Sequence, residues 1–304
     1  MRVLIVGCGY VGRALGAELT RQGHEVAGVR RSRGAQADLR SAGIQPIVAD
    51  ITQLGELAAL PRGWDWVVNC SSSSGGAAAD YREVYLHGTR NLVEWLMAAP
   101  PRKFVYTSST SVYGQNDGSL VTEDCPTEPA VETGQVLVAT ESLLLEAARQ
   151  RGFPAAILRV AGIYGPGRGH WFKQYMAGTA VVEGEGQRLL NMIHRDDVVG
   201  AIIAALQNGQ PGQVYNAADD EPVSQRAFYQ WLSATLGGPM PPVVPADASA
   251  ASKRGATNKR VSNRRLRLEL GCQLKYPTFR EGYAAEIERL RQAGEWDAAK
   301  LAVY

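Results

Sequence analysis

Short apolar runs alternate with longer amphipathic segments along the first half of the chain. Val3–Val6 is an unbroken apolar run that ends at a glycine, which is typical of a strand buried on both faces. In the segment that follows, Val11, Leu15 and Leu19 recur at every fourth position and form one stripe of a helix over residues 10–21. The chain therefore opens with a buried strand followed directly by an amphipathic helix.

The same alternation continues to about residue 160. Further strands are predicted at residues 25–29, 45–49, 66–69, 103–107 and 155–160. Long helices are predicted at residues 80–99 and 132–151. Strands and helices that alternate in this way indicate parallel βαβ units, so we predict an α/β fold built on a doubly wound parallel sheet.

A glycine-rich turn joins the first strand to the first helix. It matches the pattern G-x-G-x-x-G with six consecutive residues, Gly7, Cys8, Gly9, Tyr10, Val11 and Gly12. The first glycine permits a tight turn, the second lets the backbone approach a pyrophosphate, and the third lets helix and strand pack closely. The free amide groups at the helix N-terminus then face the phosphates. The turn therefore predicts dinucleotide binding, since a bare strand–helix turn needs only one glycine.

The segment after the second predicted strand bears on the choice of cofactor. An NAD site normally has an acidic residue about 20 residues beyond the glycine loop. This chain has Val-Arg-Arg-Ser-Arg at residues 29–33 instead. Guanidinium groups suit a 2′-phosphate, so we predict NADP(H) as the preferred cofactor, read by Arg30 and Arg31, with NAD(H) as the second choice. A solvated basic turn is the alternative role of these arginines.

Three further residues are predicted to lie beside the cofactor. Asp50 closes the third strand and either accepts a hydrogen bond from the adenine amino group or caps the next helix. Cys70 and Ser71 follow the fourth strand, and ligands bind at the carboxyl ends of the strands in open α/β sheets. The serine- and glycine-rich loop at residues 71–76 is either a mobile lid or a linker.

The chain changes character after Gly165, where glycine and proline become frequent and short elements are mixed. One more strand of the first sheet is expected at residues 213–216. We expect a dinucleotide-binding domain of the Rossmann type at residues 1–165, to which residues 190–218 approximately return. Residues 166–304 are expected to form a smaller C-terminal substrate domain.

Composition excludes several classes of protein. Hydrophobic residues make up 45% of the 304 residues and charged residues 20%, which is ordinary for a folded globular chain. No apolar run reaches the ~20 residues of a membrane span, and the first run is too short for a signal peptide. The four cysteines are widely spaced, which argues against disulfides or a metal site and favours a cytoplasmic location. The net charge of +2 points to neither a nucleic acid nor a membrane partner.

Later segments extend the pattern over nearly the whole chain. With the glycine loop, they resemble the extended short-chain dehydrogenase/reductases, the NAD-dependent epimerase/dehydratase group. Residues 105–114 resemble that family's fifth strand and serine-rich turn, 158–167 its LRxxxxYGPG segment, and 192–199 its IHVDDVA segment. Residues 213–219 resemble its seventh strand. The resemblance implies a small-molecule substrate such as a sugar nucleotide, and a homodimer formed through the long helices.

The chain departs from this family at the catalytic residues. The family's set is Asn, Ser or Thr, and Tyr-x-x-x-Lys, and the resemblance places the hydroxyl at Ser109. With Glu141 fixing the register of the helix, the tyrosine position is Thr133 and the lysine position is Leu137. Tyr85 stands where the family has its helical asparagine. A threonine hydroxyl is a far weaker acid than a phenol of pKa about 10, and leucine supplies no charge.

Another acid must therefore serve if hydride transfer occurs. Tyr85, Tyr113 and Tyr164 are candidates by local context, and each can instead be a half-buried aromatic residue with a satisfied hydroxyl. His194, beside two aspartates, is expected to be structural.

Two features near the family's substrate region remain open. Residues 253–267 hold seven basic residues and no acid, so some of Lys259, Arg260 and Arg264 either clasp a pyrophosphate or form a solvated face. No aromatic residues interleave with these charges, so nucleic acid is not an expected partner. Trp171 and Phe172 either line the substrate pocket or pack in the core.

These observations lead to two functional hypotheses. The first is an atypical NADP(H)-dependent oxidoreductase or epimerase that acts on a sugar nucleotide or another small carbonyl or hydroxyl compound. Ser109 would hydrogen-bond the substrate oxygen, and an acid that the sequence does not identify would protonate it. The candidate catalytic residues beside Ser109 are Tyr113, Tyr85 and Thr133. The second is a non-catalytic NADP(H)-binding redox sensor, which the missing tyrosine and lysine favour.

Overall fold

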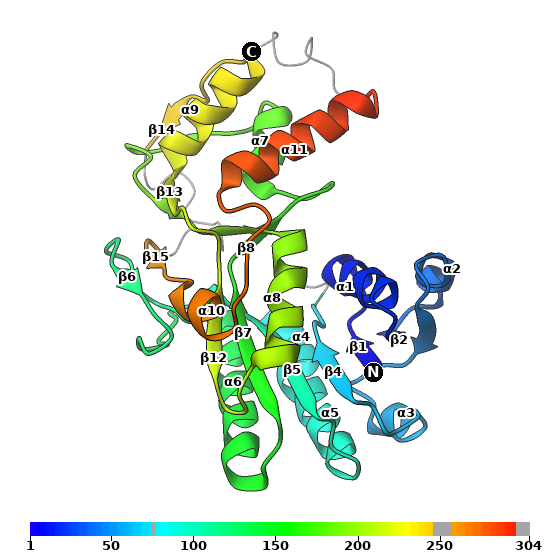
Figure 1. Cartoon of the computed structure of the whole chain (residues 1–304). Coiled ribbons are helices and arrows are strands. Elements are labelled where there is room, and N and C mark those ends of the chain that lie inside the picture. Colours follow the sequence, from blue (N-terminus) through cyan, green and yellow to red (C-terminus); the bar gives the residue numbers. More distant parts are fainter. Residues whose placement is uncertain (74–76, 246–256, 296–304) are drawn as a thin grey trace.

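A seven-stranded parallel sheet forms the centre of the computed structural model, which describes residues 1–73, 77–245 and 257–295 (Figure 1). In the order β3-β2-β1-β4-β5-β7-β12, the strands are Gln45–Val48, Glu25–Arg30, Arg2–Val6, Trp66–Asn69, Lys103–Ser109, Ala155–Val160 and Val214–Ala217. Each neighbouring pair is parallel. The predicted α/β class and doubly wound sheet are confirmed.

The strand order reverses between β1 and β4. The chain runs outward from β1 to β3, crosses back to β4 beside β1, and then runs outward on the other side to β12. A crevice forms at such a switch point, outside the carboxyl ends of the two strands. The loops that begin at Gly7 and at Cys70 therefore lie side by side at the predicted ligand position.

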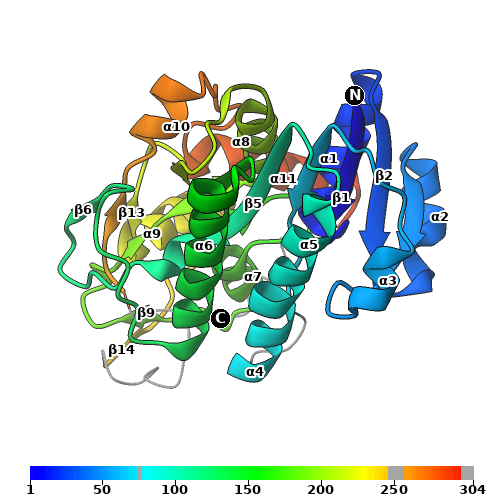
Figure 2. The ribbon, with the colours of Figure 1, turned by 90° about the horizontal axis from the view of Figure 1, so that it is seen from below.

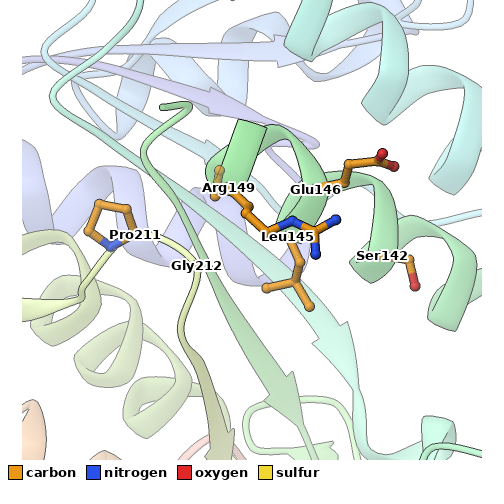
Figure 3. Close-up of a pocket in the computed structure, with 7 residues that line it drawn as sticks. Ser142, Leu145, Glu146, Arg149, Pro211 and Gly212 are labelled. Atoms are coloured by element: carbon orange, nitrogen blue, oxygen red, sulfur yellow. The ribbon is translucent and has the colours of Figure 1, made fainter. Parts of the chain in front are cut away.

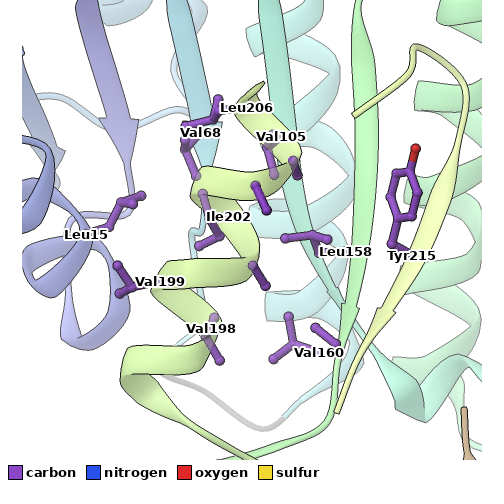
Figure 4. Packing of buried hydrophobic residues seen from close by; sticks show 14 of the residues in the cluster. Leu15, Val68, Val105, Leu158, Val160, Val198, Val199, Ile202, Leu206 and Tyr215 are labelled. Atoms are coloured by element: carbon purple, nitrogen blue, oxygen red, sulfur yellow. The ribbon is translucent and has the colours of Figure 1, made fainter. Parts of the chain in front are cut away.

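Helices cover both faces of the sheet. One face carries α1 (Tyr10–Arg21), α2 (Gln36–Ser41) and α8 (Arg195–Asn208), and the other α3 (Leu54–Ala58), α5 (Gly88–Met97) and α6 (Glu132–Arg151). Figure 2 shows α5 and α6 side by side. Figure 4 shows Val198 and Ile202 of α8 in the same buried cluster as Val105 and Leu158 of the sheet. These apolar contacts hold α8 against the sheet, beside α1.

The predicted helix at residues 80–99 differs from the observed structure. The segment contains α4 (Ala78–Tyr81), a π-helix at Arg82–His87, and then α5. A π-turn holds more residues than an α-turn, and apolar spacing alone does not reveal where that change occurs. The predicted and observed bounds are the same for two helices, at 10–21 and 132–151, and for two strands, at 66–69 and 155–160.

A separate apolar cluster lies above the carboxyl ends of the strands (Figure 1). It is built by α7 (His170–Met176), α9 (Gln225–Leu236) and α11 (Phe279–Gln292). Short strand pairs accompany these helices: β8 (Gly162–Tyr164) with β11 (Met192–His194), β9 (Val182–Glu183) with β14 (Val243–Val244), and β10 (Leu189–Leu190) with β13 (Val223–Ser224). In this cluster Phe172 is buried, and its ring packs 5.2 Å from that of Tyr283.

The remaining elements link the two clusters. They are β6 (Leu120–Val121), β15 (Arg260–Val261) and α10 (Arg264–Glu269). β6 pairs with β15, so the segment that follows β5 is joined to the C-terminal part of the chain. In the ranges that the structure covers, no helix is both long and apolar enough to cross a membrane.

Candidate functional site

The glycine loop has the geometry that a pyrophosphate requires. Gly7 has a φ of +79°, and a Cβ there would lie 2.4 Å from the backbone of Ser71. A Cβ at Gly12 would lie 2.9 Å from the carbonyl oxygen of Gly7 and 3.1 Å from Ile5. At Gly9 the nearest atom to a Cβ would be 3.8 Å away. Gly7 and Gly12 are therefore needed for packing, whereas the space over Gly9 is open to a ligand.

Hydrogen bonds hold this loop against the sheet. The amides of Gly7 and Cys8 both donate to the carbonyl of Val29, at 3.2 and 3.1 Å. The thiol of Cys70 donates to the carbonyls of Val6 and Gly7, at 3.4 and 3.3 Å. Burial raises the pKa of the Cys8 thiol to about 12 and also raises the pKa of Cys70. Both cysteines therefore stay protonated and serve to hold the loop.

A cavity of about 290 Å³ lies over the loop, at the switch point of the sheet. Its lining comes from the segments that follow β1, β2, β3 and β4, and from the π-helix. The lining residues are Val6, Gly7, Gly9, Val29, Arg30, Arg31, Ser32, Ala49, Asp50, Ile51, Thr52, Ser71, Ser72 and Val84. Six of the residues predicted to bind the cofactor are in this set: Gly7, Gly9, Arg30, Arg31, Asp50 and Ser71.

The charged residues of the cavity lie at its β2 and β3 edge. Arg30 is half-buried at the end of β2, and Arg31 is exposed. Asp50 accepts hydrogen bonds at one carboxylate oxygen from the amide and the hydroxyl of Thr52, at 2.9 and 2.8 Å. That turn precedes α3, so Asp50 shapes the helix entry and lines the cavity at the same time. The two guanidinium groups are therefore the free charges with which this edge can meet a ligand.

Tyr10 joins the glycine loop to the segment beyond β8. Its hydroxyl donates to the carbonyl of Pro166 at 3.1 Å, and its ring lies 5.1 Å from the guanidinium of Arg168 and 5.4 Å from that of Arg195. Val11 packs against the core cluster on the same helix. Both side chains thus hold the loop in place, and its backbone faces the cavity.

Two consecutive serines end β5 and have different partners. Ser108 is buried and donates to a carboxylate oxygen of Glu141 at 2.6 Å. Ser109 is half-buried, and its hydroxyl oxygen accepts the amide of Ser111 at 3.2 Å in the short 3₁₀ turn Thr110–Val112. The proton of Ser109 has no acceptor among the described residues, so this hydroxyl can still donate to a ligand.

The start of α6 lies against this serine turn. A Cβ at Gly134 would lie 3.1 Å from the carbonyl oxygen of Ser111. Thr133, one residue earlier, is half-buried, and Leu137, one turn later, is only 4% exposed. The structure therefore brings the serine turn and the family's tyrosine position together, with an apolar side chain at the lysine position.

Tyr113 belongs to a buried hydrogen-bond network. Its hydroxyl donates to Asn216 at 2.7 Å and accepts from Arg159 at 2.8 Å, and the guanidinium of Arg159 stacks on its ring. Arg159 also pairs with Glu141 at 2.7 Å. From the sequence, Glu141 fixed only the register of the helix at residues 132–151. The network of Tyr113, Glu141, Arg159 and Asn216 joins four separate segments and was not predicted. The phenol of Tyr113 is fully buried and has no path to a substrate.

Tyr85 has a different environment. It lies in the π-helix next to Val84, which lines the cavity, and its ring packs 4.9 Å from that of Tyr81. Its side chain is half-buried. Burial, together with Tyr81, raises the pKa of Tyr85, so the phenol is protonated at neutral pH. Such π-turns are rare and are frequent at functional sites.

Tyr164 and His194 pack on each other below the C-terminal cluster. The ring of Tyr164 stacks 4.3 Å from that of Tyr283, and its hydroxyl donates to the carbonyl of Thr278 at 3.3 Å. His194 is buried, and its Nδ1 accepts the amide of Asp196 at 3.1 Å, which caps α8. Burial lowers the pKa of His194 to about 4, so the ring is neutral. Both residues have structural partners.

The basic residues near the C-terminus do not point the same way. Arg260 is exposed and donates to the carbonyl of Gly118 at 3.1 Å, and Arg264 is exposed at the start of α10. Lys259 is buried instead. The three side chains thus occupy different environments and form no shared clasp.

A second hollow lies at the opposite edge of the sheet (Figure 3). Its volume is about 620 Å³, and its lining comes from α6 and the turn before β12, including Arg149, Leu145 and Gly212. The amide of Gly212 donates to Ala155, the first residue of β7, so this hollow lies at the amino ends of the strands. It is larger than the cavity over the glycine loop but lies far from the switch point.

The sheet order, the glycine loop and the cavity together define a Rossmann-type nucleotide-binding protein. The chain belongs to the NAD dependent epimerase/dehydratase family, which matches residues 3–218. The resemblance drawn from the sequence is confirmed. By family, the chain is classed with the NAD-dependent enzymes of epimerase and dehydratase type.

Individual relatives cover almost the whole chain. Protein YeeZ of Escherichia coli strain K12 is 30% identical over 281 residues, which cover 91% of this chain and 96% of YeeZ. A 3-diazoavenalumate denitrifying reductase from Streptomyces sp is 28% identical over 315 residues, which cover 94% of this chain and 100% of the reductase. DesIV, a dTDP-glucose 4,6-dehydratase from Streptomyces venezuelae solved with NAD bound, has a TM-score of 0.83 at 22% identity. That match covers 98% of this chain and 99% of DesIV, and it shows the shared fold.

Proposed function

We propose that this chain is an NADP(H)-dependent oxidoreductase or epimerase that acts on a sugar nucleotide or another small carbonyl or hydroxyl compound. The cavity at the switch point carries the proposal, because an open glycine loop and two arginines, Arg30 and Arg31, line the same hollow. The loop suits a pyrophosphate, and the arginines suit a 2′-phosphate. The names of the relatives support the type of reaction, since one is a reductase and another is a dehydratase solved with NAD.

The preference for NADP(H) rests on the charges of the cavity. Asp50 is the single carboxylate in the lining, and one of its oxygens is taken up by Thr52. The guanidinium groups of Arg30 and Arg31 have no ion-pair partner among the described residues. Such a surface favours a ligand with an additional phosphate, and NAD(H) is the weaker candidate.

Two side chains of the protein would serve the reaction beside the serine turn. When bound, the cofactor supplies or accepts a hydride at its nicotinamide ring. Ser109 donates a hydrogen bond to the substrate oxygen, since its proton has no other acceptor among the described residues. Tyr85 holds the proton that this oxygen gains or loses, because its phenol is protonated and half-buried and belongs to the π-helix whose Val84 lines the cavity. Thr133 lies beside the same turn and contacts the substrate without transferring a proton.

Two features of the same region support a second function, that of a non-catalytic redox sensor. The hydroxyl of Tyr113 is bound inside the protein, and Leu137 places an apolar group at the lysine position. A non-catalytic redox sensor needs only the cofactor cavity. Such a sensor would bind NADP⁺ and NADPH with different affinities and turn over no substrate.

The test combines turnover with binding. Oxidation of NADPH and NADH is followed by absorbance with small aldehydes and ketones, and reduction of NADP⁺ and NAD⁺ with UDP-glucose and dTDP-glucose. Sugar products formed without net change of the cofactor are detected by chromatography, and cofactor affinities are measured by calorimetry. We expect turnover of at least one compound, and binding of NADPH at least about tenfold tighter than NADH, or roughly 1.4 kcal/mol. No turnover with unequal affinities for NADP⁺ and NADPH would favour the sensor. No turnover with equal affinities would contradict both functions.

A further inference from the structure

Lys259 is a buried cation without a buried counter-charge. It is 4% exposed, and no carboxylate pairs with it among the described residues. Its ammonium donates instead to the carbonyl of Tyr113 at 3.1 Å and to the hydroxyl of Thr257 at 2.8 Å. Burial lowers the pKa of Lys259 to about 8, so the group is mainly charged at neutral pH. A buried charge that lacks a partner destabilises a fold, so a lysine here serves another purpose.

The backbone around Lys259 is fixed on both sides. The next two residues form β15, which pairs with β6. The side-chain amide of Asn191 donates to the carbonyl of Lys259 at 2.9 Å and accepts the amide of Val261 at 2.8 Å. The amide of Asn258 donates to the carbonyl of Gln115 at 3.2 Å. Lys259 therefore cannot turn toward solvent without opening the contact between three segments of the chain.

The contact with Tyr113 places this cation at the serine turn. Ser109 precedes the 3₁₀ turn Thr110–Val112, and Tyr113 ends it. The carbonyl that accepts from Lys259 thus belongs to the last residue of the turn that presents Ser109. An ammonium group has three N–H donors, and two of them are in use. In an interior of low dielectric constant, its charge acts on the turn with little screening.

We propose that Lys259 is a positioning residue of the candidate active site. It holds the serine turn through the carbonyl of Tyr113, and it supplies there the positive charge that Leu137 does not provide. The charge favours negative charge that develops on a substrate oxygen bound by Ser109. This role rests on the proposed function, because it concerns the same reaction.

Variants of Lys259 should behave differently according to whether the residue is purely structural or has the proposed positioning role. Replacement by methionine removes two hydrogen bonds and one uncompensated buried charge. If the hydrogen bonds were the purpose of the residue, the variant would be less stable and equally active. If the charge serves the reaction, the variant is at least as stable and less active.

The experiment uses the full chain and three substitutions at this position. Lys259→Met removes the charge, Lys259→Gln removes it but keeps a donor, and Lys259→Arg keeps the charge. Lys173→Met, in which an exposed lysine of α7 is replaced, is the matched control. The measurements are the thermal midpoint, the Kd of NADPH, and kcat and KM for the compound that the wild type turns over fastest.

We expect Lys259→Met and Lys259→Gln to lower kcat by about 100-fold, the usual effect of removing a group that stabilises developing charge. KM and the Kd of NADPH should stay close to those of the wild type. The thermal midpoint should stay the same or rise. Lys259→Arg should recover most of kcat, and Lys173→Met should match the wild type.

Several results would overturn the role of Lys259 and leave the proposed function intact. One is a wild-type kcat in Lys259→Gln, which decides the matter even if Lys259→Met fails to fold. Another is a lower thermal midpoint with unchanged kcat in Lys259→Met. Absence of any turnover by the wild type would instead overturn the proposed function and this role together.

Discussion

The glycine loop and the serine turn lie at the same edge of the sheet but are built in different ways. The glycine loop is made by consecutive residues, Gly7–Gly12, which pack against β2, the loop after β4 and, through Tyr10, the segment beyond β8. The serine turn is assembled from β5, the start of α6 and the segment at Lys259. The first region keeps a glycine-rich loop, as G-x-G-x-x-G where the family more often has G-x-x-G-x-x-G, and the second lacks the family's tyrosine and lysine.

The difference follows from the chemistry of the two tasks. A pyrophosphate is bound by backbone amides and by the N-terminus of a helix, so the sequence is constrained to glycines at fixed positions. Proton transfer needs a side chain of suitable pKa at one point in space, and any nearby element can supply it. The residues that a pyrophosphate site requires are therefore local in sequence, whereas a proton donor can come from any nearby element of the fold.

The largest expected effect separates Tyr85 of the π-helix from Tyr113 at the end of the serine turn. Tyr85→Phe should lower kcat by about 10²–10⁴-fold, the usual contribution of a general acid, with little change in the Kd of NADPH. Tyr113→Phe should instead lower the free energy of unfolding by about 1–3 kcal/mol, because it leaves buried partners at Asn216 and Arg159 unsatisfied. Kinetics and chemical denaturation of both variants measure this. A larger loss of kcat in Tyr113→Phe would assign the proton to Tyr113.

The next effect concerns the packing of the glycine loop. Gly7→Ala places a Cβ 2.4 Å from the backbone of Ser71 at a φ of +79°, so it should destabilise the fold by about 2–4 kcal/mol and weaken NADPH binding. Gly23→Ala is the matched control, because Gly23 has a φ of +83° but no atom within 4 Å of a Cβ. It should cost only about 1 kcal/mol, since the conformation alone is unfavourable. Equal losses in urea denaturation would show that close approach to Ser71 is unimportant.

The buried charge of Lys259 should appear in the pH dependence of stability. The pKa of Lys259 is about 8 in the folded chain, against an ordinary value of 10.5. Below pH 8 the ammonium is therefore charged in both the folded and the unfolded chain, and the folded chain bears the full free-energy cost of burying it. Between pH 8 and 10.5 the folded state loses the proton first, and the penalty disappears. The wild type should therefore gain about 3 kcal/mol relative to Lys259→Met over this range. A constant difference between the two proteins would mean that the ammonium is not destabilised by burial.

The smallest effect concerns the choice between the two cofactors. Replacement of both Arg30 and Arg31 by alanine should weaken NADPH binding by about 10–100-fold, because charge-assisted hydrogen bonds to the 2′-phosphate are lost. The Kd of NADH should change by less than about threefold, since NADH lacks that phosphate. Calorimetry with both cofactors measures the ratio. Equal losses for NADPH and NADH would remove the NADP(H) assignment.

Much of the nucleotide-binding half was predictable from local pattern. The helices at 10–21 and 132–151 have the predicted bounds, because both carry clear helical patterns and α6 ends at a glycine with left-handed φ. The inner strands β1 and β4 read as apolar runs, because helices cover both faces of the sheet there. The π-helix was not predictable, because its effect on side-chain direction leaves no distinct apolar spacing.

The sequence by itself determined the sheet, the glycine loop and the absence of the family's tyrosine–lysine pair. Those features depend on neighbouring residues and on backbone conformation, and both can be read along the chain. Only the tertiary structure decided that Tyr113 is enclosed by Arg159 and Asn216, that Tyr85 lies in a π-helix and packs on Tyr81, and that Lys259 is buried. Burial and hydrogen-bond partners come from segments more than 40 residues apart, and they set which side chains remain free to act on a ligand.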